Sequence, residues 1–548
     1  MVDVGDAMRT KINPVCLFCL LLSVVLLCGI VAFAADSPSP TLQHATAFAA
    51  GPVSSSVPAA NPLPLLAIGL ELPPSSEFSL LYHVIGLGNG FPNYMASGAG
   101  PGANLAVGGS EVVQAASLSY ADFDKGTGAI IPLGGQDSTL DNTIWHSLLP
   151  GTLCANNNGG GLLVKFDRAA SRWILTQNVY ESPYAVCIAV SQTPTFSDNL
   201  WFAYQFPVVQ SGFPSYPIFG VWATGGPSDG YFQTWNNLGP GGSDYVGPVM
   251  CGYHRAKLLA GDGSAEQICF QLTTSDSYLL PADLDSPVGP PATEDEFFIG
   301  GVDAVDNSHL SLYSMHINDW ATGDASMTGL NNSQLVAVEP YTGACNGQFG
   351  GDCIPQEGGR DLDSVSDRLM YRFAYWDDRP SATVTAAPPI PPPLQHWLVN
   401  FAVETPTGQV GSRWFEFIAS HRTVPVTSLS VFQQGTYAGS PADTNYRWLG
   451  SIARDNVQDI LLGYSISNSS MYPSIAVAGR KYSDQQGTLS GDQFSVTGGG
   501  PGANPWGPYS SMEIDPSDNC TFFFTTEYYM TSSGWSTDIS SWKFPNCH

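Results

Sequence analysis

Short runs of aromatic and β-branched residues, separated by turn residues, dominate the chain beyond about residue 76. No amphipathic helical period persists there for more than about three turns. The 58 glycines and 42 prolines supply the frequent turns that short strands need. The pattern therefore predicts an all-β protein, mostly antiparallel.

Two stretches near the C-terminus repeat one pattern. YRWLGSIARDNVQDILLGYS, residues 446–465, and PWGPYSSMEIDPSDNCTFFF, residues 505–524, each hold a tryptophan near the start and an aspartate behind a Ser-Ile or Ser-Met pair. The two aspartates, Asp455 and Asp515, lie 60 positions apart. A catalytic site occurs once, whereas a turn recurs in each folding unit. We therefore interpret the repeat as structural.

A second pair of similar stretches supports this interpretation. FDKGTGAII from Phe123 and FDRAASRWIL from Phe166 each run from an aromatic residue through Asp and a polar turn into an apolar strand. Each predicts a hairpin whose Asp bonds turn amides. Gly-Pro-Gly-Ala-Asn also occurs twice, at residues 100–104 and 500–504, as neighbouring first and last blades of a ring would allow.

Spacings of roughly 40 to 60 residues between such units are typical of the four-stranded blades of a β-propeller. We predict a propeller of about seven blades, within a range of six to eight. A β-sandwich or a two-domain β protein is the alternative, because the length alone would allow two domains.

The N-terminus predicts export. Arg9 and Lys11 precede an apolar run from Val15 to Phe33, and small residues follow at Ala34 and Ala35. This pattern is typical of a signal peptide over residues 1–35, although the apolar run is long enough to span a bilayer if it is not cleaved. Residues 36–75 are rich in Pro, Ser and Ala and predict a flexible segment. The propeller domain is then expected over residues 76–548.

Cysteine usage agrees with an exported, secreted or cell-surface protein. Three of the eleven cysteines, Cys16, Cys19 and Cys28, belong to the signal segment, and eight remain. An even number in an exported chain predicts disulfides, and no CxxC or Cys/His cluster suggests zinc. Because a blade is a local unit, we expect consecutive pairing: Cys154 with Cys187, Cys251 with Cys269, Cys345 with Cys353, and Cys520 with Cys547.

The formal charge of −28 excludes nucleic acid as a plausible partner, because such a surface repels phosphates. Only 12% of the residues are charged, so the surface must be largely hydroxyl and amide groups with scattered acids. An acidic chain raises the question of calcium, but DFDKGTG, residues 122–128, departs from the EF-hand loop. We expect no cofactor, with calcium as the weaker alternative, and no transmembrane segment after signal cleavage.

The richest polar stretch is RDLDSVSDRLMYR, residues 360–372. As a strand from Asp367, it would place Arg368 and Arg372 together on the face opposite Asp367. Carboxylates beside arginines can serve acid/base chemistry or hold an anionic sugar. The competing interpretation is a salt bridge between blades, with aspartates that bond turn amides. Asp363, Asp367 and Arg368 are the candidate catalytic residues.

A second candidate site comprises Tyr509, Ser510, Asp515 and Asp518, with Glu527 and Tyr528 as further members of a sialidase-like arrangement. SDNCTFFF lacks the glycine of a sialidase Asp-box turn, which favours a structural role. His316 shares a strand face with Leu310 and Leu312, and this pattern predicts a core histidine. The tryptophans that could stack on sugars are expected to pack between sheets instead: Trp222, Trp235, Trp320 and Trp397.

Two long motifs resemble an uncharacterised family of exported, mainly bacterial β-propeller-like proteins. They are LDSVSDRLMYR, residues 362–372, and WGPYSSMEIDPSDNCTF, residues 506–522. The similarity runs from about Val112 to Cys547. The resemblance implies a propeller and brings no agreed activity with it.

The sequence favours a secreted binding module for a glycan or another extracellular polymer, with an extracellular protein as a further partner class. A glycoside hydrolase or polysaccharide lyase of propeller type is the alternative, since propellers host both functions. Whether the protein is an enzyme stays open at this level. The deciding observation is whether Asp363, Asp367 and Arg368 converge in a pocket at the axis of the ring.

Overall fold

The computed structural model describes residues 38–53, 77–94, 96, 100–157, 161–242, 244–274, 276–302, 306–328, 334–346, 351–379, 393–422, 424–440 and 442–548. Residues Pro38–His548 form one compact unit. The expected signal peptide at residues 1–35, with its three cysteines, lies outside the described residues. Within them, no helix is long and apolar enough to cross a membrane.

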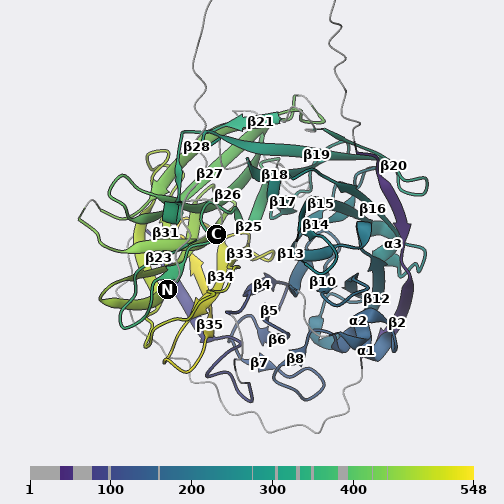
Figure 1. Cartoon of the computed structure of the whole chain (residues 1–548), viewed down its shortest axis with the longest axis horizontal. Helices are drawn as coiled ribbons and strands as arrows, with labels where there is room; N and C mark the ends of the chain where they lie inside the picture. Colours follow the sequence, from purple (N-terminus) through teal and green to yellow (C-terminus); the bar gives the residue numbers. More distant parts are fainter. Residues whose placement is uncertain are drawn as a thin grey trace, which may run out of the picture. The chain divides into compact units, whose positions relative to one another are not determined.

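We divide the described strands into seven blades, numbered 1 to 7 (Figure 1), of which blades 4 and 5 are joined into one ten-stranded sheet by the pairing of β17 with β25. Blade 1 contains β4 (Asn104–Val107), β5 (Glu111–Ala116), β6 (Ser119–Asp124), β7 (Ile130–Ile131) and β8 (Thr139–Leu140). Blade 2 contains β9 (Leu163–Asp167), β10 (Arg172–Val179), β11 (Ala185–Ser191) and β12 (Leu200–Pro207). Blade 3 contains β13 (Phe213–Trp222), β14 (Gly230–Leu238), β15 (Tyr245–His254) and β16 (Glu266–Gln271). Blade 4 contains β17 (Asp276–Leu284), β18 (Glu296–Val302), β19 (His309–Asp319), β20 (Asp324–Thr328) and β21 (Gln334–Ala337).

The remaining blades follow in chain order. Blade 5 contains β25 (Met370–Asp377), β26 (Leu394–Glu404), β27 (Val410–Ser420) and β28 (Ser430–Tyr437), with the short β22 (Thr342–Gly343) beside β26. Blade 6 contains β29 (Tyr446–Arg454), β30 (Ile460–Asn468), β31 (Met471–Arg480) and β32 (Ser490–Val496). Blade 7 contains β33 (Ser511–Ile514), β34 (Thr521–Tyr528), β35 (Ser536–Lys543) and the N-terminal strand β3 (Ser79–Ile85).

Few other elements connect the blades. A two-stranded sheet, β23 (Asp352–Ile354) and β24 (Leu362–Asp363), precedes β25. The helices are short: α1 (Thr143–Leu148), α2 (Leu153–Asn156), α3 (Arg255–Ala260), η1 (Phe196–Asp198), η2 (Val209–Ser211) and η3 (Ala344–Asn346).

The first strands of the blades contact one another in cyclic order. β4 contacts β9, and the contacts continue through β13, β17, β25 and β29 to β33, which in turn contacts β4. Between β17 and β25 the contact is a parallel hydrogen-bonded pairing. A cycle of seven antiparallel blades is a β-propeller, as the repeat spacing predicted, and neither a β-sandwich nor a two-domain protein.

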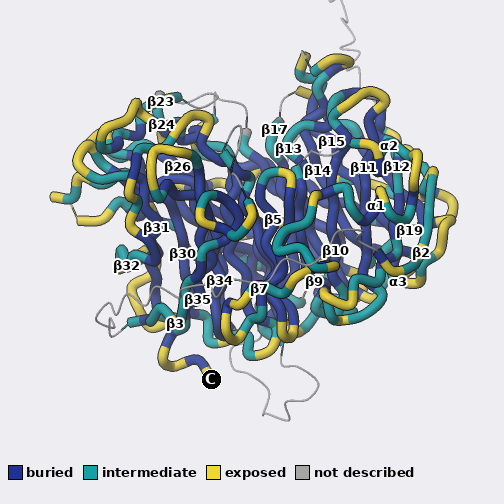
Figure 2. Tube along the Cα trace, turned by 90° about the horizontal axis from the view of Figure 1, so that it is seen from below, coloured by how far each residue is buried: buried dark blue, intermediate teal, exposed yellow. Residues whose placement is uncertain are grey.

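The middle strands are buried on both faces (Figure 2). β10, β11 and β34 show almost uninterrupted burial, without the alternation of a half-exposed strand. Each sheet packs between two neighbouring sheets, so both of its faces are removed from water. The four tryptophans that were expected to pack between sheets are all buried: Trp222, Trp235, Trp320 and Trp397.

The chain closes the ring with its N-terminal strand. β3 pairs antiparallel with β35 and becomes the fourth strand of blade 7. Gln114 of blade 1 joins the two ends of the ring, because its Nε2 donates to Thr525 and Thr537 of blade 7 at 2.7 and 2.9 Å. The two Gly-Pro-Gly-Ala-Asn stretches also meet, since Gly100 donates its N–H to the carbonyl of Pro505, directly after the second stretch, at 3.1 Å.

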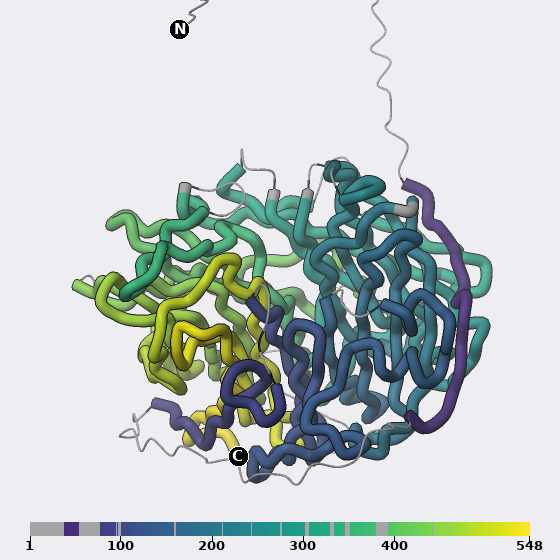
Figure 3. Tube along the Cα trace, turned by 60° about the horizontal axis from the view of Figure 1, so that its bottom comes forward, coloured from purple at the N-terminus to yellow at the C-terminus, as the bar shows by residue number. Residues whose placement is uncertain are grey.

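The prediction that residues 36–75 form a flexible segment is wrong for its first part, where two strands form. β1 (Thr41–His44) pairs with β16 and β2 (Ala47–Pro52) pairs with β12, each as a fifth strand (Figure 3). The edges of those two sheets offer unpaired backbone groups, which a Pro/Ser/Ala-rich segment can satisfy without a strong strand pattern of its own. Residues 54–75 lie outside the described residues.

The repeated C-terminal pattern belongs to neighbouring blades 6 and 7. The rings of Trp448 and Trp506 lie 5.8 Å apart. Asp455 and Asp515 each accept a backbone N–H two residues ahead in a hairpin turn, at 2.9 and 2.8 Å. The two predicted hairpin aspartates behave alike: Asp124 accepts from Thr127 and Asp167 from Ala170. The repeat is therefore a folding unit, as predicted.

The structure contains the four disulfides that consecutive pairing predicts. They are Cys154–Cys187, Cys251–Cys269, Cys345–Cys353 and Cys520–Cys547. The first two lie within or beside single blades, and the last ties residues directly before β34 and after β35. The paired cysteines lie close together in the sequence. The expectation that each blade is a local unit therefore predicted the pairing.

Candidate functional site

A cavity of about 670 Å³ opens where several first strands begin, and we call it the axial cavity. Its wall comes from the segments before β4, β9, β25 and β33, from β13 itself, and from the turns after β5 and β10, which together belong to five of the seven blades. Lining residues that bear aromatic rings or charges are Tyr180, Glu181, Tyr216, Asp363, Arg368, Trp506 and Tyr509. Aromatic rings with a few polar groups are typical of a ligand site.

Arg368 is held in place by aromatic rings rather than by an acid. Its guanidinium carbon lies 4.7 Å from the ring centre of Tyr216 and 4.0 Å from that of Tyr278. Its Nη2 donates to the Tyr278 hydroxyl at 3.1 Å. Among the described residues Arg368 forms no ion pair, and its Nε is buried without a hydrogen-bond partner. The guanidinium is thus positioned but not neutralised.

Both tyrosines that hold Arg368 sit on irregular backbone. Tyr216 has φ +55° and Tyr278 has φ +54°, in the left-handed region that β-rich chains rarely use outside glycine. Each lies where the strand register shifts, in β13 and in β17. A bulge of this kind redirects a side chain that a regular strand would point elsewhere. The bulges therefore place two neighbouring blades' tyrosines around one arginine.

Tyr509 completes the aromatic wall. Its ring stacks on Tyr216 with centres 4.7 Å apart and planes 10° apart. Its hydroxyl donates to the carbonyl of Pro217 at 2.9 Å. Burial is the main cause that raises the pKa of Tyr509 well above its usual value, so the phenol stays protonated. Its ring, fixed by this hydrogen bond and by the stacking on Tyr216, forms part of the cavity wall.

Two carboxylates line the axial cavity. Asp363 Oδ1 accepts the backbone N–H of Gly351 at 2.9 Å and that of Val365 at 2.8 Å, so it bonds turn amides as the sequence suggested. Glu181 is exposed and directly follows Tyr180. Glu181 and Tyr180 were missed by the sequence reasoning, because no local motif marks the turn after β10.

The three predicted candidate residues do not all converge. Asp363 and Arg368 line the axial cavity, whereas Asp367 is absent from its lining. Burial raises the pKa of Asp367, and its charge acts on Tyr341, a residue of a different cavity. Asp367 therefore has no place in a site with the other two.

The predicted strand from Asp367 is also wrong. β25 begins at Met370, and its pairing with β26 is irregular up to Ala374. Val365 and Ser366 adopt φ +52° and +55°, which turns the chain before the strand starts. Arg368 and Arg372 consequently point to different environments instead of sharing one face.

Arg372 belongs to a buried cluster of charges, which we call the axial ion network. Its guanidinium pairs with Asp283 at 2.7 Å, with Glu513 at 3.1 Å and with Asp285. Lys165 joins the same carboxylates through Asp283 and through Glu513, the latter at 2.6 Å. The four main residues come from β9, β17, β25 and β33. The network is thus the salt bridge between blades that the sequence offered as its structural interpretation.

The neighbouring charges determine which carboxyl groups of the axial ion network are ionised. Burial would raise the pKa of Asp283, but Lys165 and Arg372 outweigh it and hold that pKa below its usual value. Burial raises the pKa of Asp285 to about 7, and nearby Glu513 and Asp283 oppose its ionisation further. Lys165, Asp283 and Glu513 lie too far apart in sequence for a motif to reveal them.

The second predicted constellation does not form one site. Tyr509 precedes β33 at the axial cavity, whereas Asp515 and Asp518 follow β33 at its other end. Ser510 donates to the carbonyl of Leu449 at 2.8 Å, and Glu527 accepts the N–H of Gly507 at 2.6 Å. The sialidase-like arrangement is therefore not assembled.

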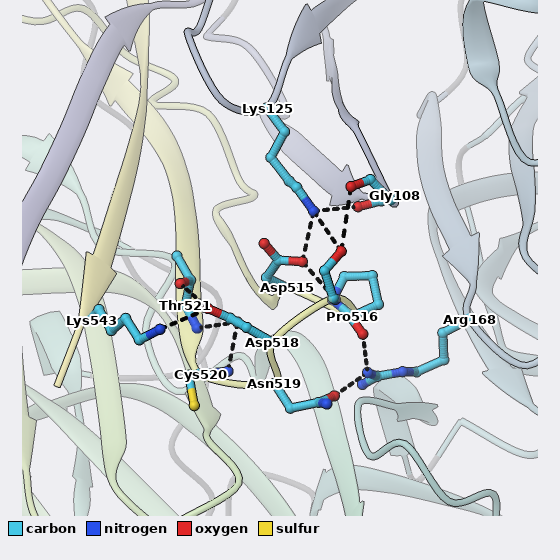
Figure 4. A network of polar contacts seen from close by, with 12 residues as sticks. Gly108, Lys125, Arg168, Asp515, Pro516, Asp518, Asn519, Cys520, Thr521 and Lys543 are labelled. Atoms are coloured by element: carbon cyan, nitrogen blue, oxygen red, sulfur yellow. Dashed lines mark hydrogen bonds and ion pairs between the residues drawn. The ribbon is translucent and has the colours of Figure 1, made fainter. Parts of the chain in front are cut away.

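The turn that holds Asp515 and Asp518 joins blades instead (Figure 4). Lys125 donates to Asp515 at 2.9 Å and to the carbonyl of Gly108 at 3.0 Å. Arg168 donates to Asn519, and Lys543 donates to Asp518 at 2.9 Å. The contacts of Lys125 and Arg168 link blade 7 with blades 1 and 2, and that of Lys543 lies within blade 7, so the turn has a structural role.

His316 is not the core residue that alternation predicted. Its side chain is 35% exposed, and Nδ1 lies 2.6 Å from Asp295 Oδ1. Its Nε2 lies 3.0 Å from Asn318 Oδ1. The histidine is satisfied but lies at the surface. In the described part of the chain, no group of three or more His, Cys, Asp and Glu side chains could hold a metal ion.

Replacing Cys345 and Cys353 together by serine is expected to lower the free energy of unfolding by about 2 kcal/mol, because the bridge closes a short loop. The same loop carries Gly351, whose N–H binds Asp363, so the change also loosens one wall of the axial cavity. Equilibrium unfolding in urea measures the loss. Serine at Cys251 and Cys269, which close a loop of 18 residues, should cost more. The reverse order would contradict the loop argument.

No protein-family profile and no curated protein matches the chain. The solved structures that resemble it include an α-L-arabinofuranosidase, Arb93A, from Fusarium graminearum, at 9% identity and a TM-score of 0.33, covering 67% of this chain and 89% of that one.

Two further solved structures are similar at the same low level. A Hadza microbial sialidase, Hz136, has 8% identity and a TM-score of 0.30 over 78% of this chain and 73% of that one. A protein of unknown function from Dyadobacter fermentans has 7% identity and a TM-score of 0.22 over 85% and 99%. These likenesses are too low to assign a shared function to this chain.

Proposed function

We propose that this chain is a secreted glycan-binding β-propeller whose ligand occupies the axial cavity. The observation that carries the proposal is the composition of the cavity wall. Tyr180 and Tyr216 supply aromatic surface, and Arg368 and Asp363 supply fixed polar groups. Sugars present both apolar ring faces and hydroxyl groups, so a wall of this mixed kind suits them.

Export supports the same proposal. The four disulfides agree with an oxidising compartment, where glycans and other extracellular polymers are the abundant ligands. The charge of −28 makes a polyphosphate an unsuitable ligand. A cavity of about 670 Å³ has room for a short saccharide rather than for a folded partner.

One observation favours hydrolysis as a second candidate function. Asp363 and Glu181 both line the axial cavity, and glycoside hydrolysis commonly uses two carboxylates on either side of the scissile bond. Asp363 is the better residue to test than Asp367, which lies outside the cavity. Release of reducing sugar that disappears in Asp363→Asn would establish this candidate in place of simple binding.

Replacing Tyr180 by alanine is expected to weaken binding of the best oligosaccharide by about tenfold, because truncation of an aromatic anchor commonly costs more than 1 kcal/mol. A glycan array identifies the oligosaccharide, and titration calorimetry measures its affinity for both proteins. Tyr482→Ala is the matched control, since Tyr482 is 55% exposed and lies outside the axial cavity. Equal losses in both variants, or no binding of any glycan, would contradict the proposal.

A further inference from the structure

We infer that the sugar in the axial cavity carries a carboxylate and that Arg368 binds it. This inference rests on the proposed function and names the ligand class of the same site. Arg368 lies on the cavity wall with its guanidinium fixed and without an ion pair among the described residues. A guanidinium fork matches a carboxylate in a bidentate way, which neither a hydroxyl nor an amide does as well.

The contrast with Arg372 shows what is unusual about Arg368. Arg372, four residues later, pairs with three carboxylates of its own chain. Arg368 instead has two tyrosine rings and one tyrosine hydroxyl. Its Nε is buried and lacks a hydrogen-bond partner, which is costly unless a ligand or water supplies an acceptor.

The backbone around Arg368 supports a binding role. Tyr216 and Tyr278 adopt positive φ at register shifts in two adjacent blades, and both rings lie against the guanidinium. Strained residues persist where the surrounding structure holds them, and they cluster at ligand sites. Here the strain has one visible result, an arginine held rigid before any ligand arrives. A rigid guanidinium loses less entropy on binding.

The other charges of the cavity limit the ligand to few carboxylates. Asp363 directs Oδ1 to two backbone N–H groups, which partly compensates its charge, whereas Glu181 is exposed at the wall. The chain as a whole is acidic, and in physiological salt its field repels anions only within about 8 Å of the surface, because salt screens it at longer range. A sugar with one carboxylate at Arg368 and hydroxyls toward Asp363 and Glu181 satisfies all three groups.

The test uses matched pairs of oligosaccharides on the full mature chain. Oligosaccharides that carry a single galacturonate, glucuronate, mannuronate or guluronate residue are each compared with their carboxyl-reduced forms, which keep the sugar and replace the carboxylate by a hydroxymethyl group. Sulfated and neutral oligosaccharides complete the set. We expect at least one uronate to bind tenfold or more tightly than its reduced form, as charge-assisted hydrogen bonds require.

Variants of Arg368 test whether this residue causes the preference for the uronate over its reduced form. Arg368→Gln should weaken that uronate by about tenfold to a hundredfold and its reduced form by a clearly smaller factor, and Arg368→Lys should retain part of the affinity. Arg422→Gln is the control, because Arg422 is exposed and follows β27 at the end remote from Arg368. The comparison of acid and reduced forms needs no variant, so it stands even if Arg368→Gln folds poorly.

Each result of the binding experiments bears on the carboxylate, on the glycan-binding function, or on both. Equal binding of acid and reduced forms would overturn the carboxylate while leaving the glycan-binding function intact. Selective binding of sulfated oligosaccharides alone would overturn it as well. Absence of binding to every oligosaccharide, neutral ones included, would overturn both the inference and the proposed function.

Discussion

Replacing Arg372 by methionine is expected to lower the free energy of unfolding by about 3–5 kcal/mol, the usual cost of removing one partner from a buried ion cluster. Only 1% of the Arg372 side chain is exposed, and the substitution leaves Asp283 and Glu513 with Lys165 as their remaining cation. Asp285 loses the cation that favours its ionisation and should remain protonated. Urea unfolding followed by tryptophan fluorescence, with disulfides intact, measures the change.

A control variant and the cooperativity of unfolding distinguish the loss of the axial ion network from a general loss of stability. Arg422→Met removes an exposed arginine at the turn after β27 and should change stability by less than about 0.5 kcal/mol. Because the axial ion network joins four blades, its loss should also reduce the cooperativity of unfolding. A stability of Arg372→Met within 1 kcal/mol of the unchanged protein would show that the network contributes little.

Replacing Asp122 by asparagine is expected to stabilise the protein above about pH 4. Asp122 is completely buried on β6, where burial, and then the charge of Glu111, raise the pKa of its carboxyl to about 9. Between about pH 4 and pH 9 the unfolded chain has lost this proton while the folded chain keeps it. The stability of the unchanged protein therefore falls with rising pH across this window.

Asparagine cannot ionise in either state, so the variant escapes that loss. Its advantage should be near zero at pH 4 and about 2–4 kcal/mol at pH 7. Asp244→Asn, at an exposed aspartate, is the control and should show no such pH-dependent difference. Other titrating groups are common to both proteins and cancel in the comparison. A difference that stays constant from pH 4 to pH 8 would show that Asp122 is ionised in the folded chain.

The candidate site was predictable only in part. The motif at residues 362–372 singled out Asp363 and Arg368, which both line the axial cavity, because a dense run of acids and arginines is a rare local pattern in this chain. It placed Asp367 with them wrongly, since the turn at Val365 and Ser366 separates neighbours in sequence. No sequence pattern marked Tyr180 and Glu181 as cavity residues, because turns that follow strands are common in this chain.

What the sequence determined by itself was local. Strand runs, hairpin aspartates, the blade repeat and four disulfides between cysteines at most 33 positions apart all follow from neighbours in the chain. The propeller class follows as well, because blade-sized repeats leave few other ways to bury both faces of each sheet.

What only the tertiary structure decided depends on residues far apart in the chain. Lys165 and Glu513 are 348 positions apart, yet they meet because first strands of different blades surround one axis. The strands β1 and β2 form because two sheet edges accept them, whatever their own composition predicts. Arg368 is held in position by Tyr216 and Tyr278, which lie on two other blades. Closing the ring creates these contacts, and no local pattern encodes which side chains it brings together.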